Sequence, residues 1–422
     1  MDIYARQFCA SDMENFGDVL YPILLDRIVA RRYPESRIGK YAFIAGDAPL
    51  DANYSNTDIR SLFGGDIKPM PLIIGGGDII RTDDLTVAGH YRSYYPNLIK
   101  RQKERTKPVL VGTSGTMTFT VHYYYTPTPE LINEIWFKKE LMPPCEFSFM
   151  LSSETCPAAS KVAFFSVGVP FEIDPKYHDL VKSTFDKAAC IYVRDGQSRE
   201  KLLKVGVAND IIVAPDMAIL VSDLFPKTEL DNLKSEALSS IGFRGDERYF
   251  CYQMSQAGVD NIHQVARVLS VITKKYGLKT VLLPLGLCHG DLAVLQAISS
   301  FVPDVARVLK TNNMWHMLAV IAHSALFAGV SLHGNLVAYS YDVPYLFTPL
   351  DVDKITGAMD ILEIPPQCRL KNWEELQSSI SSLLESGETI INRSGRIESM
   401  KKTMAAVYAL LDSISQPSLG VA

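Results

Sequence analysis

The chain has 422 residues, which is too long for one simple core and favours two α/β domains. Hydrophobic residues make up 47% of it and charged residues 21%, as in an ordinary globular protein. The net charge of -5 argues against a nucleic-acid partner, because no basic stripe is present to neutralise phosphates. An anionic ligand must therefore be met by local cations.

Targeting and redox signals point to the cytoplasm. The N-terminal stretch MDIYARQFCASDMENFGD carries acids and lacks a continuous apolar core, so it does not resemble a secretory signal. No run of about 18 apolar residues is present, so we expect no membrane span. The seven cysteines are scattered and contain no CxxC pair, which favours reduced thiols.

Short β-rich runs alternate with amphipathic helical stretches, which is typical of parallel sheets wound with helices. The first block, 1–222, has candidate strands at 41–45, 71–74, 109–112, 162–167, 190–193 and 211–214. We interpret 223–247 mainly as a linker with a short helix. The second block, 248–370, is predicted to be Rossmann-like, with strands at 248–254, 279–284, 325–330 and 344–347 and helices at 260–276, 291–300, 314–323 and 333–342. Residues 371–422 are predicted to be helical and to pack back on the first domain.

The motif Asn15-Phe16-Gly17-Asp18 precedes a stretch with apolar residues at helical spacing. Asp18 is the expected N-cap of this helix. One interpretation is that the glycine turn admits a ligand to the backbone while Asn15 or Asp18 binds its hydroxyls. The alternative is that the motif only caps the helix.

Three glycines and an aspartate, Gly75-Gly76-Gly77-Asp78, follow a buried strand, and ligands bind at such strand ends in open α/β sheets. The motif fits neither GxGxxG nor GxxxxGK[ST], so we expect no dinucleotide site and no Walker-type ATP site. The glycines either let the backbone contact a ligand or form a tight turn.

The stretch 113–160 is less regular and contains His122 and three consecutive tyrosines, 123–125. It could be an insertion over a cleft, where aromatic rings stack on a sugar. It could equally be a packed surface excursion.

Arg194 and Asp195 stand at the end of the strand 190–193, and Asp216 follows the strand 211–214. The Arg194 guanidinium could clamp a carboxylate or phosphate. Alternatively, Arg194 and Asp195 are structural, with Asp195 capping the next helix.

Two loops of the second block bring histidines to strand ends. His289 and Asp291 follow the strand 279–284, although Asp291 could simply cap a helix and His289 could be solvated. An apolar strand also runs directly into Ser331-Leu332-His333-Gly334 and a helix. Free N–H groups and the helix dipole favour an anion there, and an imidazole moves protons near neutral pH. Alternatively, Ser331 is an N-cap and His333 is satisfied by backbone groups.

In this order, NFGD, GGGD, SVGVP, YVRDGQS with KLLKVGV, PDMAIL and SLHGNLVAYSYDVP resemble the polysaccharide pyruvyl transferase family. The resemblance covers roughly residues 10–350, without 84–160. The chain departs from the family at two positions. Ser331 stands where many members have the arginine of Arg-Leu-His, and Met217 stands where Asp-Pro is usual.

The resemblance implies two Rossmann-like domains arranged as in GT-B glycosyltransferases, with the donor in the C-terminal domain and the acceptor on the N-terminal side. It implies transfer of pyruvate from phosphoenolpyruvate onto sugar hydroxyls as a ketal, with His333 as acid/base. By position, Asp18 and Arg194 are the other catalytic candidates. The expected donor contacts are Ser331, Leu332, Gly334, Asn335 and His289, and the expected acceptor contacts are Asn15, Gly76, Gly77 and Asp78.

We expect no metal and no bound cofactor, because the eight histidines are dispersed without HxH or HExxH and the ketal chemistry does not demand a metal. The implied acceptor is a saccharide or a lipid-linked saccharide of exopolysaccharide biosynthesis. The sequence leaves the acceptor and any homo-oligomer open. Two other functions stay open as well: a GT-B glycosyltransferase that uses a nucleotide sugar, and a noncatalytic carbohydrate-binding protein.

Overall fold

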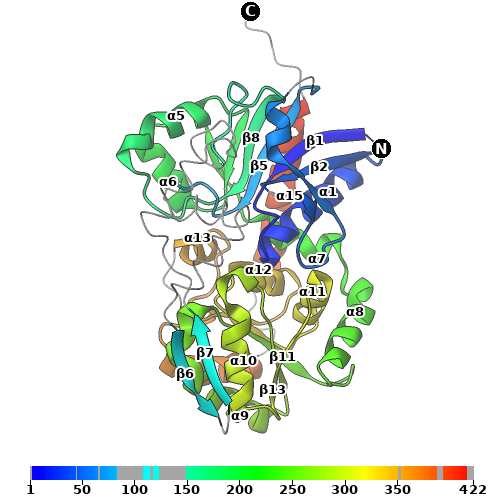
Figure 1. The fold of residues 1–422 in the computed structure, drawn as a ribbon, viewed down its shortest axis with the longest axis vertical. Coiled ribbons are helices and arrows are strands. Elements are labelled where there is room, and N and C mark those ends of the chain that lie inside the picture. Colours follow the sequence, from blue (N-terminus) through cyan, green and yellow to red (C-terminus); the bar gives the residue numbers. More distant parts are fainter. Residues whose placement is uncertain are drawn as a thin grey trace, which may run out of the picture.

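The computed structural model describes residues 2–43, 45–64, 67–82, 108–114, 117–122, 149–349, 353–386 and 393–415. Two largely parallel sheets, each packed with helices, lie one above the other in Figure 1. Helices α12 (Leu332–Ser340) and α13 (Asp353–Ile361) lie between the sheets. The predicted α/β fold with two Rossmann-like domains is confirmed.

The N-terminal sheet has the strand order β10-β9-β8-β5-β1-β2-β4-β3, and only the β3–β4 pair is antiparallel. Its strands are β1 (Asp2–Phe8), β2 (Ser36–Ala42), β3 (Gly46–Asp47), β4 (Ser55–Asp58), β5 (Met70–Gly77), β8 (Ala159–Val167), β9 (Cys190–Val193) and β10 (Ile211–Val213). Its helices are α1 (Phe16–Arg32), α5 (His178–Asp186) and α6 (Gly196–Lys204). The strand order reverses between β1 and β5, so a ligand crevice is expected at their carboxyl ends.

The C-terminal sheet has the order β13-β12-β11-β14-β15, and its strands are all parallel. The strands are β11 (Tyr249–Gln253), β12 (Lys279–Leu282), β13 (Ala306–Val308), β14 (Phe327–Gly329) and β15 (Tyr345–Phe347). The helices between them are α9 (Ile262–Tyr276), α10 (Asp291–Phe301) and α11 (Met314–Ala322). Here the order reverses between β11 and β14, which places the carboxyl ends of these strands at a second switch point.

Further helices join the two domains. The stretch 223–247, expected to be mainly a linker, is largely α8 (Lys227–Ser240), which packs on α11 through buried residues such as Leu230 and Leu238. Helix α7 (Val221–Leu224) precedes it, and α14 (Leu376–Ser386) packs on α9. Helix α15 (Arg393–Ser415) returns to the N-terminal domain and contacts β8 and β9 (Figure 1). Short 3₁₀ helices are η1 (Ile59–Phe63), η4 (Pro175–Tyr177), η5 (Met217–Leu220), η6 (Gln256–Asn261), η7 (Leu287–His289), η8 (Pro366–Cys368) and η9 (Trp373–Glu375).

Two strand predictions differ from the structure, and five strands were not predicted. The predicted strand 41–45 is β2, which begins at Ser36, and the strands that were not predicted are β1, β3, β4, β7 (Met117–His122) and β13. Strand β1 gives a weak sequence signal, because polar and apolar residues do not alternate in DIYARQF. The polar residues Arg6 and Gln7 are both buried. The strand predicted at 109–112 lies in β6 (Pro108–Ser114), which pairs antiparallel with β7 outside the parallel sheet. The tyrosine run 123–125 lies outside the described residues.

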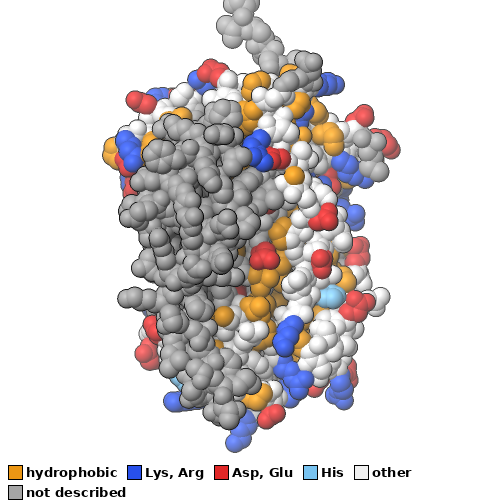
Figure 2. All heavy atoms as spheres, in the orientation of Figure 1, with side chains coloured by type: hydrophobic (Ala, Val, Ile, Leu, Met, Phe, Trp, Pro, Cys, Tyr) orange, Lys and Arg blue, Asp and Glu red, His pale blue; other side chains and the backbone are white. Residues whose placement is uncertain are grey.

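Acidic and basic side chains are interspersed over the described part of the face drawn in Figure 2. In the described part of the chain, no helix combines the length and apolarity that a membrane crossing needs.

Helix α12 is the most enclosed element at the domain junction, because all nine of its residues are buried. Its last residue, Ser340, donates a hydrogen bond to the carbonyl of Ile219 over 2.7 Å and accepts one from the N–H of Ser222 over 3.0 Å. The helix therefore belongs to the packing of both domains.

We predict that Gly334→Ala lowers the free energy of unfolding by about 1–3 kcal/mol. A Cβ at position 334 would lie 2.3 Å from Cζ of Phe327 and 2.7 Å from Cδ1 of Leu285. Urea denaturation measures the effect. The matched control is Gly196→Ala, where a Cβ would meet no atom within 4 Å. Equal stability of Gly334→Ala and wild type would contradict the packing described for α12.

Candidate functional site

The two switch points meet where α1 begins. The N–H of Phe16 donates to the carbonyl of Leu285 over 2.8 Å, and Asn15 forms a β-bridge with Gly286. These backbone contacts hold the loop after β1 against the loop after β12. The NFGD motif therefore lies beside the SLHG motif.

Asn15 is the N-cap of α1, and the expectation that Asp18 caps this helix is wrong. The side chain of Asn15 accepts the N–H of Gly17 over 3.3 Å. Because the helix begins three residues earlier than expected, Asp18 lies in its first turn and its carboxylate faces the end of β5. A Cβ on Gly77 would lie 3.1 Å from Oδ1 of Asp18.

The close approach that Gly17 permits is to a side chain of the protein. A Cβ at Gly17 would lie 1.8 Å from Nδ1 of His333. Gly76 is similar, because its φ is +97° and a Cβ there would lie 2.5 Å from the ring of Tyr21. The spaces that we assigned to a ligand at these two glycines are filled by His333 and Tyr21.

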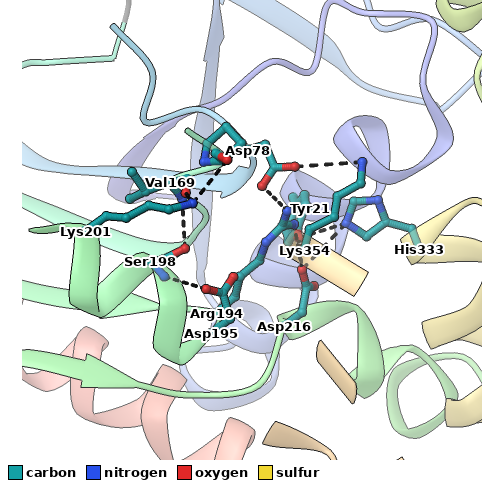
Figure 3. A network of polar contacts seen from close by, with 11 residues as sticks. Tyr21, Asp78, Val169, Arg194, Asp195, Ser198, Lys201, Asp216, His333 and Lys354 are labelled. Carbon is teal, nitrogen blue, oxygen red and sulfur yellow. Dashed lines mark hydrogen bonds and ion pairs between the residues drawn. The ribbon is translucent and has the colours of Figure 1, made fainter. Parts of the chain in front are cut away.

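Three side chains form a hydrogen-bonded line across the domain junction (Figure 3). The hydroxyl of Tyr21 donates to Oδ2 of Asp216 over 2.5 Å and lies 3.0 Å from Nε2 of His333. Nε2 itself is 3.7 Å from that carboxylate oxygen. Tyr21 comes from α1, Asp216 caps η5, and His333 comes from α12.

Arg194 is held between two carboxylates. Its Nη1 lies 3.2 Å from Oδ2 of Asp216, and its Nη2 forms an ion pair with Asp78. The Arg194 side chain is only 3% exposed. The residue predicted to clamp a ligand anion thus already neutralises two buried acids, while Asp195 caps α6 through the N–H of Ser198.

Lys354, at the start of α13, is a more accessible cation at Asp78 than Arg194. Its Nζ lies 3.8 Å from Oδ2 of Asp78, and its side chain is 34% exposed. Figure 3 shows it reaching the cluster from the side opposite Lys201. Our sequence analysis missed this lysine, although it follows β15 as other candidates follow their strands.

Burial and neighbouring charge separate the three carboxyl groups. Burial raises the pKa of Asp18 to about 6, against the opposing charges of His333, Lys354 and Arg194. Burial also disfavours ionised Asp216, but the charges of His333 and Arg194 and the hydrogen bond from Tyr21 hold its pKa well below the usual value. Desolvation also raises the pKa of Asp78, but the positive charges of Arg194 and Lys354 have the larger effect and lower it overall. Of these three carboxyl groups, Asp18 is therefore the one whose pKa lies nearest to neutral pH.

The SLHG turn is fixed by its own hydrogen bonds. Ser331 caps α12 by accepting the N–H of Gly334 over 3.2 Å. The amide of Asn335 donates to the carbonyls of Gly329 and Ser331 over 2.9 and 2.8 Å. Leu332, Gly334 and Asn335 are buried, so these predicted donor contacts face the packing of the turn.

Asp291 is connected to this turn by hydrogen bonds through Gln253. It does not cap α10, whose N-cap is Gly290. Its Oδ2 accepts from the side chain of Gln253 over 2.8 Å and from the N–H of Gly286 over 2.9 Å. Gln253 in turn accepts the N–H of Ser331 over 2.9 Å. Burial raises the pKa of Asp291 to about 7. His289 is exposed in η7, and the described contacts of His333 do not include it.

Sequence reasoning found His333, Asp18, Arg194 and Asp78 and missed Tyr21, which lies in an apolar helix and looks like a core residue. Asp216 was noted at its strand end but was given no role. Within the described part of the chain, no group of three His, Cys, Asp or Glu side chains is arranged to hold a metal ion.

The family model for polysaccharide pyruvyl transferases, a transferase family, matches residues 139–348. A search of curated proteins returned no match. Among solved structures, UDP-GlcNAc 2-epimerase from Neisseria meningitidis, bound to UDP-GlcNAc, superposes with a TM-score of 0.52 at 11% identity, covering 98% of this chain and 99% of that one. The UDP-GlcNAc 2-epimerase from Methanocaldococcus jannaschii superposes with a TM-score of 0.52 at 10% sequence identity, covering 97% of this chain and 99% of that one. A glycosyltransferase from Rickettsia africae superposes with a TM-score of 0.50 at 9% sequence identity, covering 99% of this chain and 100% of that one. These similarities show the predicted GT-B-like fold.

We predict that Gly17→Ala and a change at His333 are strongly coupled. The alanine Cβ would overlap the imidazole, so Gly17→Ala lowers the free energy of unfolding in the wild-type background. In a His333→Ala background the same change costs less, with a coupling energy of about 1–3 kcal/mol. Urea denaturation of the four proteins measures it. Additive effects would show that the ring does not pack on Gly17.

We predict that Asp18→Asn stabilises the protein near neutral pH. Because the pKa of Asp18 is about 6 in the folded protein and 3.8 for an ordinary aspartate, ionised Asp18 lowers the free energy of unfolding above that range. The cost disappears as the pH falls through 6 toward 3.8, where the carboxyl is protonated in both states. We expect a gain of about 2 kcal/mol near pH 8 that shrinks near pH 4.5.

Urea denaturation of both proteins at these two pH values gives the comparison. The control is Asp246→Asn, whose side chain is 77% exposed and should change little at either pH. A gain for Asp18→Asn that grows as the pH falls would have the wrong sign for a carboxyl with a raised pKa.

Proposed function

We propose that the protein transfers pyruvate from phosphoenolpyruvate onto two hydroxyls of a sugar as a ketal, because the family model for polysaccharide pyruvyl transferases matches residues 139–348. The observation that supports this best is the pairing of His333 with the Tyr21–Asp216 hydrogen bond at the point where both switch points meet. An imidazole in that setting can move protons, and an accessible lysine lies across the same cluster.

The donor carries a carboxylate and a phosphate, so its site needs cationic groups. Lys354 is the proposed donor cation, since Arg194 is enclosed by Asp78 and Asp216. The N-terminus of α12 adds a partial positive charge beside His333. In this proposal Lys354 supplies the charge that many family members carry at the position of Ser331.

The reaction requires one proton to reach C3 of the donor and two sugar hydroxyls to lose theirs. Both new C–O bonds to the sugar form at C2 of the donor, and the bond from C2 to the phosphate oxygen breaks. One hydroxyl proton balances the proton added at C3, and the other leaves with phosphate. His333 is the proposed group that delivers the proton to C3. Asp18, with a pKa of about 6, is the proposed group that accepts a hydroxyl proton.

The acceptor is proposed to lie on the N-terminal side, against Asp18 and Asp78. For an enzyme of the polysaccharide pyruvyl transferase family, the proposed acceptor is a saccharide or a lipid-linked saccharide of exopolysaccharide biosynthesis in the cytoplasm. Neither step draws on a metal or a bound cofactor.

We predict saturable binding of phosphoenolpyruvate to the purified protein by calorimetry. Lys354→Met should weaken this binding about tenfold or more, because a charge at the donor is lost. The control is Lys204→Met, which removes a lysine paired with Glu172 at the surface of the N-terminal domain. His333→Gln should keep most of the binding and lose turnover with sugar acceptors.

The same titration separates the competing functions. Binding of a nucleotide sugar such as UDP-GlcNAc, without binding of phosphoenolpyruvate in the presence or absence of saccharides, would favour a glycosyltransferase. Binding of saccharides alone would favour a noncatalytic carbohydrate-binding protein. Either result would overturn the proposed reaction.

A further inference from the structure

We propose that Tyr21 is a positioning residue that fixes His333 with a proton on Nε2, which leaves Nδ1 as the ring nitrogen that can take up a proton. The assignment of the ring proton stands on geometry alone. The role of Nδ1 in turnover rests on the proposed function.

A tyrosine hydroxyl has a single hydrogen, and the geometry decides where it goes. The hydroxyl of Tyr21 lies 2.5 Å from Oδ2 of Asp216, a distance typical of a hydrogen bond to an ionised carboxylate. An ionised carboxylate only accepts, so the hydrogen of Tyr21 points to Asp216. Arg194 lies 3.2 Å from the same oxygen and keeps it ionised.

The other contact of the hydroxyl must then be one in which its oxygen accepts. Nε2 of His333 lies 3.0 Å away, within normal hydrogen-bond distance. Since the hydrogen of Tyr21 is already used, Nε2 has to carry the proton and donate it. Direct donation from Nε2 to Asp216 is excluded by the separation of 3.7 Å.

Tyr21 cannot easily change this arrangement. Its side chain is 1% exposed, and Gly76 packs so closely that a Cβ there would lie 2.5 Å from the tyrosine ring. The rings of Tyr21 and His333 meet edge to face, with centroids 5.3 Å apart and an interplanar angle of 89°. The hydroxyl is thus held by packing on one side and by a buried ion pair on the other.

The consequence concerns the opposite edge of the imidazole. In the neutral ring Nδ1 carries the lone pair, and it lies against Gly17 in the first turn of α1, where an added Cβ would be 1.8 Å away. When Nδ1 takes up a proton, the positive charge is stabilised by Asp216 through the Tyr21 hydroxyl. This is the way an oriented carboxylate supports a catalytic histidine, with a tyrosine hydroxyl inserted between the two.

The test is nuclear magnetic resonance of the unliganded protein labelled with ¹⁵N-histidine, at a pH where the imidazole is neutral. The signals of His333 are assigned by their loss in His333→Gln. Two-bond couplings distinguish a ring protonated at Nε2 from one protonated at Nδ1. We expect the Nε2–H form in the wild type, and a wild-type ring protonated at Nδ1 would overturn the proposal.

Tyr21→Phe keeps the ring and removes the hydroxyl. We expect the His333 signals of this variant to become those of a mixture of both tautomers. The matched control is Tyr249→Phe, which removes another buried hydroxyl that donates to the carbonyl of Val320 and should leave the His333 signals unchanged. An unchanged His333 spectrum in Tyr21→Phe would show that another group fixes the ring.

A kinetic measurement tests the role of Nδ1. Tyr21→Phe should lower kcat about tenfold or more, while the KM for phosphoenolpyruvate changes less than about twofold. A proportional rise in KM with unchanged kcat would contradict a positioning role. Since the spectra need no substrate, a protein that binds no phosphoenolpyruvate would refute the proposed function and still report the tautomer.

Discussion

The buried carboxylate of Asp216 is the constraint around which the site is built. An ionised acid that is 3% exposed is costly unless several donors surround it. Asp216 receives Arg194 and the hydroxyl of Tyr21 at Oδ2, and the N–H of Ala218 at Oδ1. These donors come from the end of β9, from α1 and from η5. The hydrogen bonds to this one carboxylate therefore fix the end of β9, α1 and η5 relative to one another. They also fix the Tyr21 hydroxyl, which orients the imidazole of His333.

The two sheets meet at their switch points because backbone groups tie them there. The N–H of Phe16 binds the carbonyl of Leu285, and Ser340 at the other end of α12 binds Ile219. Separation of the domains would break these bonds and remove Tyr21 from His333. The proton-transfer geometry is consequently a property of the joined domains, and neither domain carries it alone.

The sequence supports prediction of the strands and of the strand ends that carry polar residues, because hydrophobic runs and following motifs are local signals. It could not show what fills the space beside a glycine. Gly17 and Gly76 both permit close approach, and a ligand and a buried ring leave the same sequence signal. Tyr21 was missed for a related reason: its partner His333 is 312 positions away, and its own neighbours are apolar. Lys354 follows a strand, but it lies seven residues beyond the end of β15, and its stretch contains no histidine.

The fold alone does not select the donor, since one architecture supports many reactions. Charge gives a sharper argument. Three carboxyl groups, those of Asp18, Asp78 and Asp216, surround a site proposed to hold an anion, and among the described residues Arg194 and Lys354 form ion pairs with Asp78 and Asp216. Asp18 resolves the conflict, because its pKa of about 6 would rise further when an anion enters. Under the proposed function, donor binding and proton uptake at Asp18 are thus coupled, and the proton arrives in the same cluster as His333, where the reaction needs it.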